Sequence, residues 1–219
     1  MYSQNAIIRS TLLVVAVVLW AMPSLAQQWE VGGSAGGSFY IDQAVAAGAA
    51  SGTVGFRPGF AVGGWIGHKA EGRLGGEVRY LFQRNDVKLA SGGTTYAFSS
   101  QSHLIHYDLL IHMNQREDRV RPFVAIGGGM KGYIGTGAER AVQPLNNLAL
   151  LSATRQWQPM LSLGGGVSWT VGSRIVLRAE VRDYVTPVPK NVILPAPGAS
   201  ISGWVHDIVP MFGVSYIIE

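Results

Sequence analysis

The chain has 219 residues, of which 29 are glycine, none is cysteine and 14% carry a charge. Its mean hydropathy of +0.20 is typical of a membrane protein, yet no apolar run reaches the roughly 18 residues that a spanning helix needs. The low charge and the many glycines exclude a coiled coil and an acidic disordered chain. The net charge of only +4, without any run of basic residues, argues against a nucleic-acid partner.

Residues 1–26 are expected to form a secretory signal peptide. Arg9 is their only charge, an apolar stretch runs from Leu12 to Met22, and small residues up to Ala26 offer a cleavage site. The mature domain is then expected to cover residues 27–219. Because an exported chain without cysteine has no disulfides, its stability must come from packing or from backbone pairing.

Apolar and polar residues alternate with a period of two through the rest of the chain. In residues 104–113, for example, Ile105, Tyr107 and Leu109 alternate with His106 and Asp108. Since successive side chains of a strand point to opposite faces, each such segment has one apolar and one polar face. The pattern predicts eight strands, at about residues 28–40, 54–67, 73–85, 96–113, 120–133, 157–169, 174–185 and 204–218.

The connections between these strands alternate strictly in length. Long connections are expected at residues 41–53, 86–95, 134–156 and 186–203, and tight turns at 68–72, 114–119 and 170–173. In an up-and-down barrel this alternation brings all long loops to one end and all tight turns to the other. The predicted fold class is therefore all-β, an eight-stranded antiparallel up-and-down transmembrane β-barrel, rather than a β-sandwich.

Alternation alone does not say which face points outward. In a soluble barrel of the lipocalin type the apolar side chains point inward, whereas in a transmembrane barrel they face lipid. The chain has too few charges for a solvated outer surface, because its polar phase consists mainly of Gly, Ser and Ala. We therefore expect the charges at strand centres to form an ion-paired network in the lumen. Its predicted members are Glu77, Arg79, Asp108, Arg178, Glu180 and Arg182.

Aromatic residues concentrate near the ends of the predicted strands. Rings at these places are typical of the interfacial girdles of membrane barrels. The candidate girdle residues are Trp29, Phe39, Phe60, Trp65, Tyr80, Phe82, Tyr107, Tyr133, Trp169, Tyr184, Trp204 and Tyr216.

Four segments resemble the OmpA-like and OmpX-like family of eight-stranded outer-membrane barrel domains. They are residues 58–64, 76–80, 121–129 and 177–184. The terminal alternation is similar to the C-terminal assembly signal of such proteins, through Phe212, Val214, Tyr216 and Ile218. The resemblance implies a place in the cell outer membrane, with membrane lipid and the β-barrel assembly machinery as partners. It also implies an extracellular or periplasmic ligand, and a structural or surface-interaction role through the long loops.

Motifs that could carry chemistry are weak in this chain. Residues 127–132 match G-x-G-x-x-G, but no helical pattern follows, as a dinucleotide site would require. His106 and Asp108 share one strand face, and a single strand cannot supply the converging ligands of a metal site. Ser99, Ser100 and Ser102 lie near His103, where a lipid-modifying enzyme could place a nucleophile and a base. We expect no catalytic, cofactor or metal site, and keep two alternatives: a narrow conduit for small or hydrophobic solutes, and a barrel enzyme.

The connection at residues 134–156 is unusually apolar for an exposed loop. It contains Leu145, Leu148, Leu150 and Leu151. Two interpretations stay open: the segment folds over the barrel mouth or contacts a partner, or it forms a short helix that packs on itself.

Overall fold

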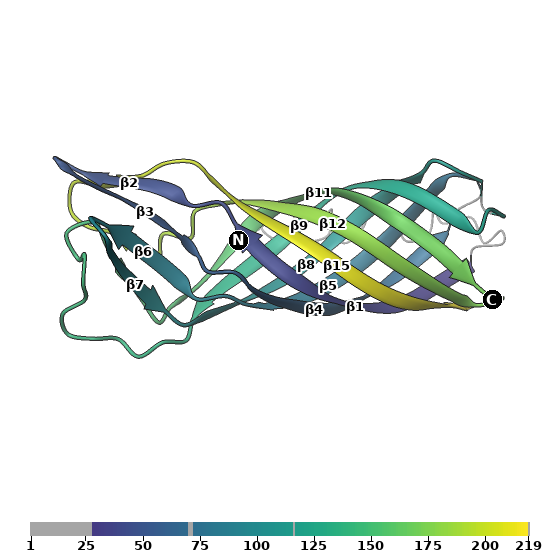
Figure 1. Ribbon diagram of the computed structural model, residues 1–219, viewed down its shortest axis with the longest axis horizontal. Coiled ribbons are helices and arrows are strands. Elements are labelled where there is room, and N and C mark those ends of the chain that lie inside the picture. The colour runs from purple at the N-terminus through teal and green to yellow at the C-terminus, as the bar shows by residue number, and fades with distance from the viewer. Residues whose placement is uncertain (1–27, 70–71, 116, 219) are drawn as a thin grey trace, which may run out of the picture.

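The computed structural model describes residues 28–69, 72–115 and 117–218, so the expected signal peptide lies outside the described residues. Eight strands close into an antiparallel barrel in which each strand pairs with the next one along the chain, and the last pairs with the first (Figure 1). These strands are β1 (Gln28–Tyr40), β4 (Gly59–Lys69), β5 (Leu74–Arg84), β8 (Ser100–His112), β9 (Val120–Gly135), β11 (Arg155–Val171), β12 (Ile175–Pro187) and β15 (Trp204–Ile218). The predicted fold class is confirmed. No helix in the described part is long and apolar enough to span a membrane.

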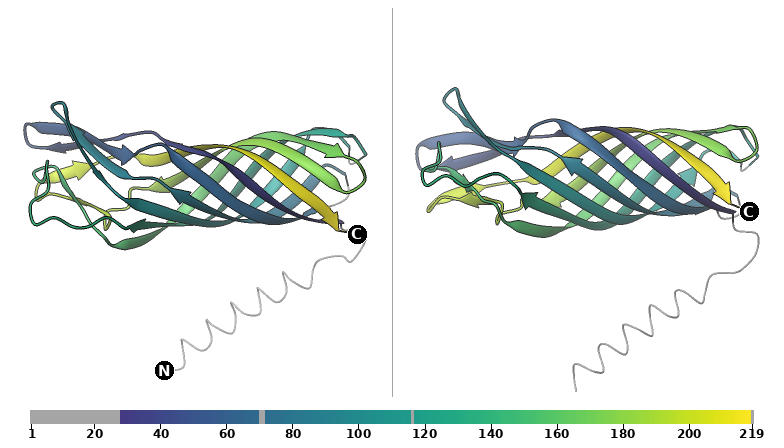
Figure 2. Two further views of the ribbon diagram at one scale, coloured as in Figure 1. Left: turned by 60° about the horizontal axis from the view of Figure 1, so that its bottom comes forward. Right: turned by 90° about the horizontal axis from the view of Figure 1, so that it is seen from below.

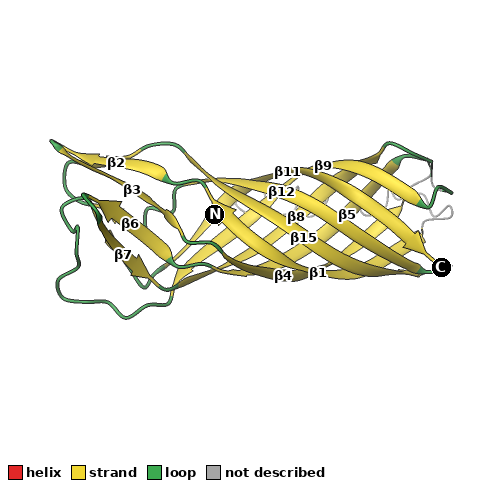
Figure 3. Cartoon of the chain, viewed as in Figure 1, coloured by secondary structure: helices red, strands yellow, loops and turns green. Residues whose placement is uncertain are grey.

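The long connections contain strands of their own at one end of the barrel (Figures 1 and 2). A five-stranded sheet has the order β14-β2-β3-β6-β7, and β10 pairs with β13 in a separate ribbon. Their bounds are β2 (Gln43–Ala47), β3 (Ala50–Phe56), β6 (Val87–Ser91), β7 (Thr94–Phe98), β10 (Ala149–Leu151), β13 (Ile193–Pro195) and β14 (Ala199–Ile201). We call this end of the barrel the loop end and the opposite end the turn end. Figure 3 shows that the described residues at both ends form strands and loops.

The predicted bounds of β1 and β15 match the structure, four other strands differ by one or two residues at their ends, and two begin four or five residues later than predicted. The strand predicted from residue 54 begins at Gly59, and the strand predicted from residue 96 begins at Ser100. In both places the first residues belong to hairpins of the loop end, β3 and β7. Residues 57–58 and residue 99 separate β3 and β7 from the barrel strands that follow them, and these interruptions are too short to be seen in the alternation.

The loop end has a hydrophobic core of its own. Phe56, Leu89 and Tyr96 of its sheet pack in one buried cluster with Tyr133 and Val205 at the ends of barrel strands. Leu148 and Leu151 are buried in the same cluster, with 0% and 1% of their surface exposed, while Leu150 is 42% exposed. The apolar connection therefore folds onto the end of the barrel, and the short helix is wrong because residues 149–151 form strand β10.

The outer face of the barrel is apolar and the inner face polar. Leu109 is 39% exposed on the outside, whereas its neighbour Asp108 is fully buried inside. The exposed apolar side chains form a band around the wall, which suits contact with lipid and excludes the soluble barrel. Members of the band include Val31, Ile66, Val78, Ile105, Ile126, Leu161, Leu163, Leu177, Val181 and Val214.

Exposed aromatic residues border this band at both ends. Trp29, Trp169 and Tyr216 lie near the turn end of their strands, and Phe39, Phe60 and Trp204 lie near the loop end. Three of the rings expected in the girdles point inward instead, since Trp65, Tyr133 and Tyr184 are buried. Whether an aromatic side chain points outward or inward therefore depends on its place in the alternation along the strand, and not on its distance from the strand end.

Replacing Leu109 by Arg should destabilise the barrel by about 2–4 kcal/mol, because a cation would enter the lipid-facing band. The measurement is the free energy of unfolding by urea in lipid bilayers. The matched control is Thr53→Arg, on an exposed position of the loop-end sheet, which should change this free energy by less than about 0.5 kcal/mol. Equal effects of the two substitutions would contradict the assignment of the outer face.

Candidate functional site in the barrel interior

The structure places all six side chains of the predicted charge network inside the barrel, each at most 5% exposed. Glu77 lies at the centre of this network. Its Oε1 accepts hydrogen bonds from Arg79 Nη2 at 2.9 Å and from Arg182 Nη2 at 2.8 Å, and its Oε2 accepts one from Arg178 Nη1 at 2.5 Å. One carboxylate thus holds three guanidinium groups.

The other two carboxylates of the network link the same arginines. Glu180 contacts Arg79 at 2.5 Å and Arg182 at 2.9 Å, and Asp108 contacts Arg182 at 2.6 Å. Strands β5 and β12, which carry most of these residues, lie four places apart in the closed order of eight strands. They are therefore opposite walls, and the ion pairs cross the lumen. Alternate residues of β12 point inward, so positions 178, 180 and 182 line up on one face.

Two members of the network were missed in the sequence. Glu30 is buried, and its Oε1 accepts hydrogen bonds from Arg178 Nη2 at 3.1 Å and from Ser215 Oγ at 2.7 Å. Trp65 also donates to this carboxylate, at 3.4 Å. The guanidinium carbons of Arg178 and Arg79 lie 4.6 and 4.9 Å from the centre of the Trp65 ring, so cation–π contacts add to the ion pairs. The sequence offered one signal for Glu30: it alternates with the apolar Val31, which places it on the polar face of its strand.

A second polar cluster, also missed, lies nearer the loop end. Lys131 Nζ contacts Asp207 Oδ2 at 2.5 Å and donates to the hydroxyl of Tyr40 at 2.8 Å. Asp207 also accepts hydrogen bonds from Gln83 at 2.8 Å and from Ser38 at 2.6 Å. Between the two polar levels lies a buried apolar layer, formed by Ala61, Leu81, Leu104, Met160, Tyr184, Val209 and Met211. Side chains thus occupy the interior at three successive levels.

The residues that suggested an enzyme are not brought together. His103 points outward, where its Nδ1 lies 2.8 Å from the hydroxyl of Tyr80, whereas Ser100 and Ser102 are buried inside. Ser99 lies just before β8 and is half-buried. His106 Nδ1 lies 3.1 Å from Asp108 Oδ2, but both side chains are buried in the network. Within the described residues, no group of three or more His, Cys, Asp or Glu side chains could hold a metal ion.

The glycine motif at residues 127–132 lies within strand β9 and not at the start of a helix. A Cβ on Gly127 would lie 2.1 Å from Asp108 Oδ1, and one on Gly129 would lie 2.6 Å from His106 Cβ. These glycines therefore leave room for the polar side chains of β8, which is a structural use of the motif.

The four residues of the predicted C-terminal assembly signal lie on the outer face of β15. Phe212, Val214, Tyr216 and Ile218 are all exposed, and β15 pairs with β1 where the barrel closes. Their recognition by the assembly machinery stays a prediction.

Replacing Glu77 by Gln should destabilise the barrel by about 3–5 kcal/mol, because three buried arginines would lose the charge that they share. Urea unfolding in detergent micelles measures this. The matched control is Asp42→Asn, which alters a partly exposed pair with Lys88 (2.8 Å) and should cost about 0–1 kcal/mol. A cost for Glu77→Gln as small as that of the control would show that the network contributes little to stability.

Comparisons with known proteins concern the fold. No family model matches the chain, and no curated protein is similar to it in sequence. Among solved structures it is similar to the outer membrane protein OprG from Pseudomonas aeruginosa, with 12% identity and a TM-score of 0.58 over 89% of this chain and 97% of that one. It is also similar to Neisserial surface protein A, with 12% identity and a TM-score of 0.53 over 86% and 96% of the two chains. The chain therefore has the fold of an integral outer-membrane β-barrel, of the eight-stranded OmpA-like and OmpX-like kind.

Proposed function

We propose that this protein is a non-conducting outer-membrane barrel whose loop-end sheet lies outside the cell and makes contacts there. The observation that carries the proposal is the trans-lumen ion network, in which arginines of β12 reach the carboxylate of Glu77 on the opposite wall. An eight-stranded barrel has an interior just wide enough for side chains. Ion pairs across its full width leave no obvious path for solutes.

The loop end supports the second half of the proposal. All four long connections contribute to its buried core, together with the ends of barrel strands. Such packing holds the connections in one shape, which favours a preformed contact surface over loops that order only on binding. Membrane lipid and the assembly machinery are the further partners that the proposal includes; the external partner is left open.

A specific observation favours a second candidate, a conduit for hydrophobic solutes. Strands β11 and β12 stop pairing at Leu161 and Val185, although both continue towards the loop end. Pro159 and Pro187, which have no N–H to donate, lie just beyond this point. An apolar groove of about 580 Å³ opens on the outer wall there, bordered by Trp204 among others.

The proposal includes no catalytic step. We propose none because Ser100 and Ser102 are buried inside the barrel, whereas His103 contacts Tyr80 on the outside.

Purified, refolded protein in planar bilayers should show no large steady conductance, since the ion network crosses the lumen. A general porin prepared in the same way is the positive control. A large steady conductance would overturn the closed lumen. Uptake of hydrophobic solutes into proteoliposomes without conductance would favour the conduit instead.

Leu148→Asp should open the loop-end core and expose the connection at residues 134–156 to protease added outside intact cells. A charge at this fully buried position has no partner, whereas the same charge in Leu150→Asp points to solvent, so that variant should resist cleavage. Both should migrate as folded barrels on SDS gels without boiling. If protease cleaved neither variant on intact cells but cleaved Leu148→Asp after lysis, the external position of this end would be wrong.

A further inference from the structure

One carboxylate of the barrel strands lies on the outer wall. The acidic residues in the described parts of the eight barrel strands are Glu30, Glu77, Asp108, Glu180, Asp183 and Asp207. All except Asp183 are at most 5% exposed in the interior. Asp183 follows the buried Arg182 and therefore points outward, with 33% of its side chain exposed. A carboxylate on a wall that faces lipid is costly, so its presence there indicates a functional site.

The ion-pair partner of Asp183 in the described part of the chain is His206 on the neighbouring strand β15. His206 Nδ1 lies 2.8 Å from Asp183 Oδ2. The other oxygen, Oδ1, is buried and has no hydrogen-bond partner among the described residues. No described lysine or arginine forms an ion pair with this carboxylate, so no permanent cation neutralises it.

His206 also lines the apolar groove on the outer wall. The groove has a volume of about 580 Å³, and its lining residues are Pro159, Met160, Leu161, Val185, Trp204 and His206. Sites for small molecules have volumes of about 300–1,000 Å³ and are mostly apolar, with a few polar groups that fix the orientation of the ligand. The groove fits this description, and His206 is the one ionisable side chain among the six.

The groove reaches into the wall where two strands separate. Pairing of β11 with β12 ends at Leu161 and Val185. Met160 belongs to the buried apolar layer of the interior and is only 5% exposed, yet it borders the groove. A hydrocarbon chain can therefore enter between the strands further than on an unbroken wall.

The hydrogen bond to Asp183 decides what His206 offers to a ligand. An imidazole that donates from Nδ1 to a carboxylate can accept a hydrogen bond at Nε2. The ring of His206 is 39% exposed, and its Nε2 is open at the surface and has no partner among the described residues. Because a carboxylate lies behind the ring, a positively charged donor is favoured at this place and an anion is disfavoured.

We propose that this groove is a binding site for a long-chain alkyl amine. The ammonium group would donate a hydrogen bond to His206 Nε2 in the negative field of Asp183, and the hydrocarbon chain would contact Leu161 and Val185. Trp204, which is 59% exposed, borders the groove at the level of the aromatic girdle, where a charged group can reach water. The site depends neither on conductance through the lumen nor on what the loop end contacts.

The test uses the absence of native cysteine, because a single introduced thiol then reports on one place. Val185→Cys puts the thiol in the groove, and the control Val181→Cys puts it on the same face of β12 outside the groove. The rate of labelling by methyl methanethiosulfonate is measured in neutral detergent micelles at about pH 8, where an alkyl amine is protonated. Decylamine at ten times its dissociation constant should slow labelling of Val185→Cys about tenfold. It should not slow labelling of Val181→Cys.

Two compounds with the same chain test the head group. Decanoate should protect neither thiol, and decanol should protect Val185→Cys less than decylamine does. Equal protection of this thiol by all three compounds would overturn the proposal, because the groove would then take any hydrocarbon chain, as it would take membrane lipid. Stronger protection by decanoate, or no protection by decylamine, would overturn it as well.

Asp183→Asn tests the charge behind His206. Asparagine can still accept the hydrogen bond from Nδ1 but carries no charge. In the Val185→Cys background, the decylamine concentration that halves the labelling rate should rise about tenfold. The matched control is Asp42→Asn at the loop end, where the acid pairs with Lys88, and it should leave this concentration unchanged. Equal values for the two variants would reject an amine as the ligand.

Discussion

The structure depends on one constraint: a barrel of eight strands must fill its narrow interior with side chains, and any charge placed there must be paired. The trans-lumen network meets this constraint by joining β5 to the opposite strand β12 through Glu77 and the arginines around it. Because hydrocarbon surrounds the wall, an unpaired charge inside would be costly. The same ion pairs that satisfy the charges also bridge the lumen, so stability and the proposed lack of conductance have one cause.

Several glycines of the barrel strands lie beside this network and give it space. A Cβ on Gly164 would lie 2.6 Å from Arg182 Cδ, and one on Gly166 would lie 2.7 Å from Glu180 Cβ. Long charged side chains on β12 thus need small residues on the adjacent strand β11, just as those of β8 need glycine on β9. Part of the glycine content is thus linked to the few buried charges, since each charged side chain inside the barrel needs space beside it.

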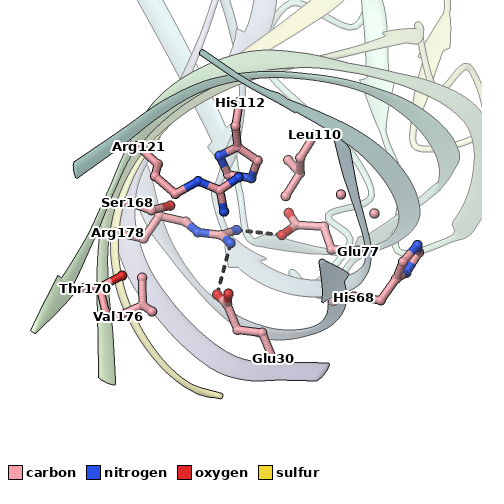
Figure 4. A pocket seen from close by; sticks show the side chains of 13 residues that line it. Glu30, His68, Glu77, Leu110, His112, Arg121, Ser168, Thr170, Val176 and Arg178 are labelled. Carbon is pink, nitrogen blue, oxygen red and sulfur yellow. Dashed lines mark hydrogen bonds and ion pairs between the residues drawn. The ribbon is translucent and has the colours of Figure 1, made fainter. Parts of the chain in front are cut away.

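A filled interior directs the proposed function to the ends of the barrel. At the loop end, the long connections share a hydrophobic core with the barrel strands, so they present a sheet and not separate loops. At the turn end, the network finishes at a small cavity whose walls include Glu30, Arg121 and Arg178 (Figure 4). The loop end thus has the features of a contact surface for macromolecules.

Local alternation was enough to predict the barrel and the strands β1 and β15, because a period of two is a property of the strand itself. The lipid-facing side followed only when the low charge of the polar phase was added. Alternation also predicted six of the charges that lie inside, but not Glu30, Lys131 or Asp207. It did not predict the hairpins of the loop end. Strands β2 and β3 consist largely of Ala, Ser and Gly, which alternate weakly in hydropathy, and the apolar residues of β7 were assigned to the barrel strand that follows. Nor did it predict that Trp65 packs against arginines, or that Lys131 meets Asp207. These contacts join strands far apart in the chain, so only the closed order of the barrel and the register of its pairs determine which side chains meet.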